Sequence, residues 1–119
     1  MKIAICASDS NTESLVADRF ARSDYFAVYN SEDLQFTFFD NPAKNEGSGA
    51  GGKAVKVLGD LDVEIVLVPE LGPKAIDALK AFEIKSFQYK QGETVRDALY
   101  SYFEKKLPEM LDASVKGEY

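Results

Sequence analysis

The sequence contains no histidine and only one cysteine, Cys6, among its 119 residues. One cysteine permits no disulfide within the chain, and it cannot build a zinc or iron–sulfur ligand set, because such sites take several Cys or His side chains. Without histidine, general acid–base catalysis would fall to carboxylates, and Asp9, Asp18, Asp40 and Glu70 form no recognisable constellation. The sequence therefore predicts a protein that is not an enzyme.

Long hydrophobic runs are also lacking. The stretch Met1–Cys6 carries one basic residue and the chain turns polar at Ser8, so the apolar segment is too short for a signal peptide or a membrane span. We expect a cytoplasmic protein with no membrane partner. The net charge of −6 disfavours nucleic acid and anionic membranes as partners, because binding to either depends on a positive surface field.

Apolar residues make up 45% of the chain and charged residues 29%, which is typical of a globular protein. A chain of this length is long enough for one hydrophobic core. We expect residues 1–107 to form a single α/β domain. Residues 108–119 show a weaker pattern and are predicted to be a loosely held C-terminal tail.

Apolar runs predict five strands, at residues 3–7, 25–29, 34–39, 64–68 and 85–89. The first and fourth runs are almost unbroken, which is typical of buried central strands. The second and third flank the polar turn Asn30-Ser31-Glu32-Asp33, which indicates a hairpin with a four-residue connection.

Helical periodicity predicts three helices. The first follows the glycine-rich run and is expected to fray at Gly59. Pro73 suits the first position of the second helix, Thr94 is a good N-cap for the third with Asp97 three residues on, and Pro108 is expected to end it. The positions expected in the core are Ala54, Val57, Leu58, Leu61, Ala75, Ile76, Leu79, Phe82, Val95, Ala98, Leu99, Tyr102 and Phe103.

This order of elements predicts a three-layer α/β/α domain. Right-handed crossovers place helices on both faces of a five-stranded mixed sheet with strand order 3-2-1-4-5, in which strand 2 alone is antiparallel. The segments that follow the other four strands, 6–22, 41–53, 69–73 and 90–94, then meet at one edge of the sheet. Ligands of open α/β sheets bind at that edge, where the connections diverge.

The glycine-rich run Gly47-Ser48-Gly49-Ala50-Gly51-Gly52-Lys53 fits the spacing of two nucleotide-binding motifs. A P-loop, however, has Ser or Thr where this chain has Ala54, and seven residues separate the preceding strand from Gly47. The run fits an anion-binding loop, because glycines let the backbone N–H groups approach a ligand closely, and it equally fits a plain polar connection. Phosphate or nucleotide binding by the Gly47–Lys53 loop is the leading alternative function.

Four segments carry a family resemblance: Asp18-Arg19-Phe20-Ala21-Arg22-Ser23-Asp24-Tyr25-Phe26, Asn41-Pro42-Ala43 with the glycines after it, Leu71-Gly72-Pro73-Lys74-Ala75 and Gly92-Glu93-Thr94-Val95. In this order and spacing they resemble the dinitrogenase iron-molybdenum cofactor family, over about residues 1–103. The resemblance implies a ribonuclease-H-like fold. It also implies binding, carriage or storage of the iron-molybdenum cofactor or of a related molybdenum–copper sulfide cluster, with cluster-biosynthesis proteins as partners. The chain departs from the family pattern at Ala21, where glycine is usual, and it has no counterpart of the carriers' cluster-binding histidine.

A metal–sulfur cluster is a bulky anion, which backbone N–H groups at a helix start and cationic side chains can hold without covalent bonds. We predict that Arg19, Arg22 and Lys53 neutralise it, although the same residues also fit solvated surface charge. The other predicted ligand-binding residues are Gly49, Gly51 and Gly52 as N–H donors, Asn41 and Asn45 as residues that shape the loop, Phe20 as an anchor, and Gly72 and Pro73 as the opposite wall.

Cys6 is the one soft candidate ligand for a metal such as copper, iron or molybdenum. It lies within an apolar strand, where a lone cysteine most often behaves as a small hydrophobic residue, and coordination requires it to reach the carboxyl end of that strand. A third function class is a protein-interaction module with no small ligand, in which the Tyr- and Phe-rich hairpin pairs with a second copy. We expect a monomer or a weak homodimer.

Overall fold

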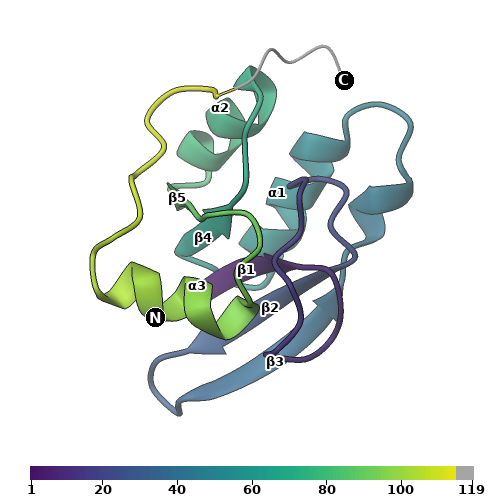
Figure 1. Ribbon diagram of the computed structural model, residues 1–119. Helices are drawn as coiled ribbons and strands as arrows, with labels where there is room; N and C mark the ends of the chain where they lie inside the picture. The colour runs from purple at the N-terminus through teal and green to yellow at the C-terminus, as the bar shows by residue number, and fades with distance from the viewer. Residues whose placement is uncertain (115–119) are drawn as a thin grey trace.

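The computed structural model describes residues 1–114, which form a three-layer α/β/α fold around a five-stranded sheet (Figure 1). The strands are β1 (Lys2–Ala7), β2 (Tyr25–Asn30), β3 (Gln35–Asp40), β4 (Ile65–Val68) and β5 (Lys85–Gln88). They lie in the order β3-β2-β1-β4-β5. β2 is antiparallel to both β1 and β3, whereas β1, β4 and β5 are parallel. The predicted strand order and the single antiparallel strand are confirmed.

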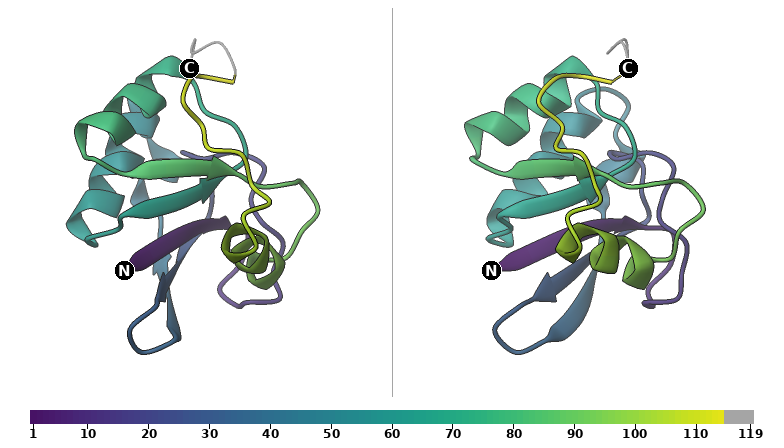
Figure 2. Two further views of the ribbon diagram at one scale, coloured as in Figure 1. Left: turned by 90° about the vertical axis from the view of Figure 1, so that its left-hand side faces the viewer. Right: turned by 60° about the vertical axis from the view of Figure 1, so that its left-hand side comes forward.

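The helices are α1 (Ala50–Asp60), α2 (Pro73–Ala81) and α3 (Val95–Phe103), with a short 3-10 helix η1 (Pro42–Asn45) between β3 and α1. Figure 2 shows α1 and α2 together on one face of the sheet and α3 on the other. η1 was not predicted. It begins where Pro42 restricts φ and the Asn41 side chain accepts a hydrogen bond from the Ala43 N–H.

The two central strands form the core of the sheet. Residues 3–7 of β1 and all of β4 are buried, because helices cover both faces at the middle of the sheet. The prediction that these unbroken apolar runs form central strands is therefore confirmed. None of the helices in the described part of the chain has the length and apolar character needed to cross a bilayer.

The ends of α2 and α3 differ from the prediction. The Thr94 hydroxyl caps α3 by accepting from the Asp97 N–H, as expected, but the helix ends at Phe103 rather than near Pro108. Lys105 has a left-handed φ of 60°, which stops the helix early. Phe103 and Phe82 were expected in the core but are 46% and 48% exposed, because each lies at the last turn or cap of its helix.

α1 ends at Asp60, one residue after Gly59, where the sequence predicted that the helix frays. A Cβ atom at this position would lie 2.5 Å from Cδ2 of Phe82. Glycine is therefore present because the aromatic ring after α2 packs directly over the backbone of α1. The sequence predicted the position of the helix end but not this packing contact.

The segment after α3 is not loosely held over residues 108–114. The Gln88 N–H donates to the Pro108 carbonyl at 2.9 Å, and the Met110 N–H donates to the Ser86 carbonyl at 2.7 Å. The Ser114 N–H then donates to the carbonyl of Leu71 at 2.9 Å. The outer edge of β5 thus holds residues 108 and 110, and the backbone of Leu71 holds residue 114. Residues 115–119 of the predicted tail lie outside the described residues, and the domain boundary at residue 107 stays a prediction.

Candidate anion-binding pocket

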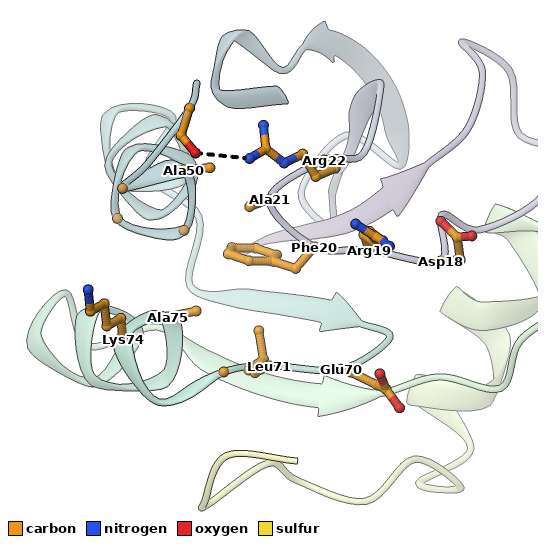
Figure 3. Close-up of a pocket in the computed structure, with 15 residues that line it drawn as sticks. Asp18, Arg19, Phe20, Ala21, Arg22, Ala50, Glu70, Leu71, Lys74 and Ala75 are labelled. Carbon is orange, nitrogen blue, oxygen red and sulfur yellow. Dashed lines mark hydrogen bonds between the residues drawn. The ribbon is translucent and has the colours of Figure 1, made fainter. Parts of the chain in front are cut away.

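A pocket of about 330 Å³ opens at the sheet edge where the sequence predicted a ligand. Residues from three segments line it, within 18–22 after β1, 47–52 at the start of α1, and 70–75 at the start of α2 (Figure 3). These segments are far apart in sequence. The parallel pairing of β1 with β4 brings their carboxyl ends together and so forms the pocket.

Two helix starts face this pocket. α1 begins after Gly49, whose φ of 73° is left-handed, and α2 begins after Gly72; neither N-cap residue makes a side-chain hydrogen bond to its helix. The first N–H groups of a helix have no acceptor within the helix, and they carry partial positive charge. Within residues 1–114, none of the following N–H groups donates a hydrogen bond: Ala50, Gly51 and Gly52 in α1, and Lys74 and Ala75 in α2.

The bottom of the pocket is apolar. Phe20 is 4% exposed and packs on Phe26 with ring centroids 6.1 Å apart, and Leu71 is 1% exposed. Figure 3 shows the Phe20 ring lying between the start of α1 and Leu71. A Cβ atom added to Gly47 or Gly52 would meet nothing within 4 Å, so the backbone at these glycines faces open space.

The charged residues of the lining are three cations and two carboxylates. Lys74 lies at one end of the view in Figure 3, whereas Asp18 and Glu70 lie at the other. Arg19 and Lys74 are exposed, and neither forms a salt bridge with another residue of the described chain. The lining thus has one more cation than carboxylates, in a protein whose net charge is −6.

Arg22 lies beside the pocket, but its guanidinium is occupied by backbone. Its Nη1 donates to the carbonyls of Lys44 at 2.8 Å and Glu46 at 2.5 Å, and its Nη2 lies 3.5 Å from the Gly47 carbonyl. Figure 3 shows the side chain reaching from its own loop to the loop before α1. Arg22 therefore braces this loop.

Lys53 lies outside the pocket lining. Its Nζ is 2.6 Å from Oε1 of Glu46, and this hydrogen-bonded ion pair lowers the pKa of the Glu46 carboxyl. The lysine of the glycine-rich motif is therefore paired within its own loop. A lysine aimed at a bound phosphate, as in a P-loop, would have to break this pair.

Asn41 is buried and ties two loops together. Its Nδ2 donates to the carbonyls of Ala21 at 3.0 Å and Ser23 at 2.9 Å, and its Oδ1 accepts from the Ala43 N–H. It thereby holds the loop after β1 against η1. Asn45 is the exposed last residue of η1 and does not line the pocket.

Cys6 lies in the core rather than in the pocket. It is fully buried, and burial raises the pKa of its thiol to about 12. Hydrogen bonds with Ser23 and Tyr89 lower the pKa, but by less than burial raises it. A thiol with this pKa stays protonated at neutral pH, whereas metal coordination uses the thiolate. Among residues 1–114, no three His, Cys, Asp or Glu residues are grouped as a metal ion would require.

The structure thus brings together one part of the predicted site. Of the predicted residues, the pocket lining contains Arg19, Phe20, Arg22, Gly49, Gly51, Gly52 and Gly72, whereas Asn41, Asn45, Lys53, Pro73 and Cys6 lie outside it. The charged lining residues Asp18, Glu70 and Lys74 were not among the predicted ligand-binding residues. Lys74 had a usable signal, because it directly follows the Gly72-Pro73 helix start at the same sheet edge.

A family model described as dinitrogenase iron-molybdenum cofactor matches residues 1–105. The chain belongs to this family. Its structure is similar to the apo form of the orange protein from Desulfovibrio gigas, with a TM-score of 0.92, 30% sequence identity and 96% of each chain covered.

A second similar structure is that of a putative NifB protein from Thermotoga, described as a DUF35 family member. It has a TM-score of 0.85 and 29% sequence identity, with 98% of each chain covered. No curated protein matches the sequence. The description of the family names an iron-molybdenum cofactor, which relates this small protein to metal clusters.

Proposed function

We propose that this protein binds and carries an anionic metal–sulfur cluster in the pocket between β1, α1 and α2. The cluster is the iron-molybdenum cofactor or a related molybdenum, copper or iron sulfide, and it is cargo rather than a catalytic group. One observation carries the proposal: two helix starts without side-chain caps face a pocket with an apolar floor. Its lining also contains Arg19 and Lys74, which have no salt-bridge partners among residues 1–114. Family membership supports the choice of cargo.

The size and polarity of the pocket suit a bulky anion better than a small one. At about 330 Å³ it falls in the range of about 300–1,000 Å³ that is usual for small-molecule sites. A cluster presents polarisable sulfides to Phe20 and Leu71, while its negative charge attracts the N–H groups of α1 and α2. A lone phosphate would leave the apolar floor unused.

The lining contains no Cys, His or Met side chain, so the protein contributes no soft ligand to the metal. The cluster is then held by hydrogen bonds and charge alone. Two consequences follow for a carrier. Its affinity falls as salt concentration rises, and the cluster leaves intact, without a metal–protein bond to break, when a biosynthesis partner accepts it.

The test is an anaerobic titration of the purified protein with tetrathiomolybdate and copper(I), followed by desalting. We expect a visible charge-transfer band that stays with the protein. ATP serves as the comparison ligand. Thermal stabilisation by ATP, with no retained band, would overturn the cluster proposal in favour of nucleotide binding.

A matched pair of variants locates the bound anion. Lys74→Gln and Lys53→Gln remove the same charge, but only Lys74 lines the pocket. We expect Lys74→Gln to weaken retention of the cluster about tenfold, because a charge-assisted hydrogen bond is lost, and Lys53→Gln to leave it unchanged. Equal weakening by both variants would mean that net charge, and not this pocket, attracts the anion.

A third variant separates binding from folding. Gly52→Ala adds a methyl group where nothing lies within 4 Å, so the fold accommodates it, and alanine favours the helix over glycine by about 0.5–1 kcal/mol. The same methyl group enters the space that the cluster would occupy. We expect unchanged or higher thermal stability together with weaker cluster retention. If Gly52→Ala retained the cluster fully, the backbone at Gly52 would not belong to the proposed site.

A further inference from the structure

The two edges of the sheet are protected differently. The β5 edge is covered by the chain itself, through an antiparallel bridge between Phe87 and Glu109. At the other edge, no strand of residues 1–114 lies beyond β3. β3 contains neither lysine nor proline, and its register with β2 runs without a bulge from Gln35 to Asp40. Lysine, proline and bulges are the usual devices that keep an edge strand from pairing with another chain.

The register identifies which backbone groups of β3 are unpaired. The Asn41 N–H donates to the Asp24 carbonyl, which places residue 41 in the set that hydrogen-bonds to β2. Because this set alternates along an antiparallel strand, Thr37 and Phe39 also bond to β2. Phe36, Phe38 and Asp40 therefore direct their N–H and C=O groups away from the sheet.

An aromatic surface adjoins this edge. Ring centroids are 6.1 Å apart for Phe38 and Phe36, 5.1 Å for Phe36 and Tyr29, and 6.0 Å for Tyr29 and Phe103. α3 packs on β1 and β4, so the hairpin of β2 and β3 projects past it (Figure 2). Phe36, Phe38 and Tyr29 are only partly buried as a result.

We propose that β3 pairs antiparallel with β3 of a second copy of this chain, around a two-fold axis, so that the two sheets become continuous. Such an arrangement gives the outward N–H and C=O groups of both strands partners at once. It also extends the aromatic surface of one copy into that of the other, since side chains on one face of paired strands are neighbours.

The charges favour a second copy as the occupant. When Phe38 lies opposite Phe38 of the second copy, Phe36 lies opposite Asp40, so the two aspartates do not face each other. The hairpin connection with Glu32 then runs toward η1 of the second copy, where Lys44 adds positive charge beside Asp24, its own salt-bridge partner at 3.4 Å. The strand is thus complementary to itself in shape and in local charge.

The overall charge opposes this association, because two molecules of net charge −6 repel each other. The dimer is therefore weak and becomes tighter as salt screens the repulsion. Cluster retention in the pocket has the opposite salt dependence. The pairing of β3 does not involve the pocket, so either proposal can fail without the other.

The experiment combines sedimentation with amide hydrogen exchange on the unaltered protein, from micromolar to millimolar concentration. We expect a dimer to form as concentration rises, more readily at high salt. Exchange at the amides of Phe36, Phe38 and Asp40 should slow in parallel, while the Thr37 and Phe39 amides, already bonded to β2, should not change. A monomer throughout, or protection at any other set of amides alone, would overturn the proposal.

A pair of variants provides the matched control. Phe38→Lys places two like charges opposite each other across the two-fold axis and should weaken association by at least about fivefold. Tyr100→Lys makes a similar change on the exposed face of α3, where Tyr100 is 61% exposed, and should leave association unchanged. Equal effects of the two variants would contradict pairing through β3. Should Phe38→Lys fail to fold, the exchange measurement on the unaltered chain still decides.

Discussion

Nη1 of Arg22 lies 2.5 Å from the backbone carbonyl oxygen of Glu46. The same nitrogen also donates to the Lys44 carbonyl. One side chain from the loop after β1 thus binds the backbone of the loop before α1, and the two loops form adjacent walls of the pocket. The pocket depends on this contact for its shape, because a planar guanidinium can hold several carbonyls in a fixed arrangement.

Arg22→Gln should reduce stability by about 1 kcal/mol, because exposed hydrogen bonds from a charged donor to the loop before α1 are lost. Urea denaturation followed by circular dichroism would measure the change. Lys53→Gln is the control and should leave the midpoint unchanged, since its ion pair is exposed. If Arg22→Gln left the denaturation midpoint unchanged but abolished anion binding, Arg22 would instead bind the anion directly.

Asn41→Asp should be more damaging than Asn41→Ala, although aspartate has nearly the same shape. The carbonyls of Ala21 and Ser23 would lose two N–H donors in either variant, at a cost of about 3 kcal/mol, and the aspartate would also bring a buried negative charge against both oxygens. Denaturation of both variants at neutral pH would give the order. Equal stability of the two variants would mean that water enters beside residue 41.

Gly59→Ala and Phe82→Ala should be coupled. In the unaltered background, the new Cβ atom would lie 2.5 Å from Phe82 Cδ2, so the clash should cancel or reverse the helix-forming advantage of alanine. With Phe82→Ala already in place, Gly59→Ala should stabilise the protein by about 1 kcal/mol. A double-mutant cycle by thermal denaturation measures the coupling, and simple additivity would show that the Phe82 ring moves aside without cost.

Stability should fall at alkaline pH because of Cys6. Burial raises its pKa from 9.0 to about 12, so between these values the unfolded chain has lost the thiol proton while the folded chain keeps it. The contribution is fully present below pH 9.0 and is lost as pH rises toward 12, by about 1.4 kcal/mol per pH unit.

Denaturation of the unaltered protein and of Cys6→Ala, each at neutral and alkaline pH, would test this. The variant should lose less stability over the same interval, because it lacks the buried thiol. Identical pH profiles would assign the alkaline loss to other groups, of which Tyr89 is one, since burial also raises its pKa.

Most of the fold could be predicted from local pattern. The apolar runs of β1 and β4 and the polar turn after Asn30 identified strands because burial on both faces, and a hairpin turn, each leave a short-range signature. The errors concern long-range contacts. The sequence placed the end of α1 near Gly59 but gave no sign of the Phe82 ring that excludes a Cβ atom there, because Phe82 follows a different helix. The bonds that hold residues 108 and 110 along β5 and residue 114 at Leu71 had no signature in the segment itself.

For the candidate site too, the sequence predicted one part and long-range contacts decided the rest. Sequence alone determined that the glycine-rich run and the Gly72-Pro73 helix start follow strands whose ends share one edge, because backbone geometry and connection handedness are general. Only the tertiary structure decided which cations remain for an anion. Glu46 pairs with Lys53, and Arg22 donates to the carbonyls of residues 44, 46 and 47, which leaves Arg19 and Lys74 at the pocket. A cation's role depends on which partner is nearest in space, and that distance is set by the folded chain.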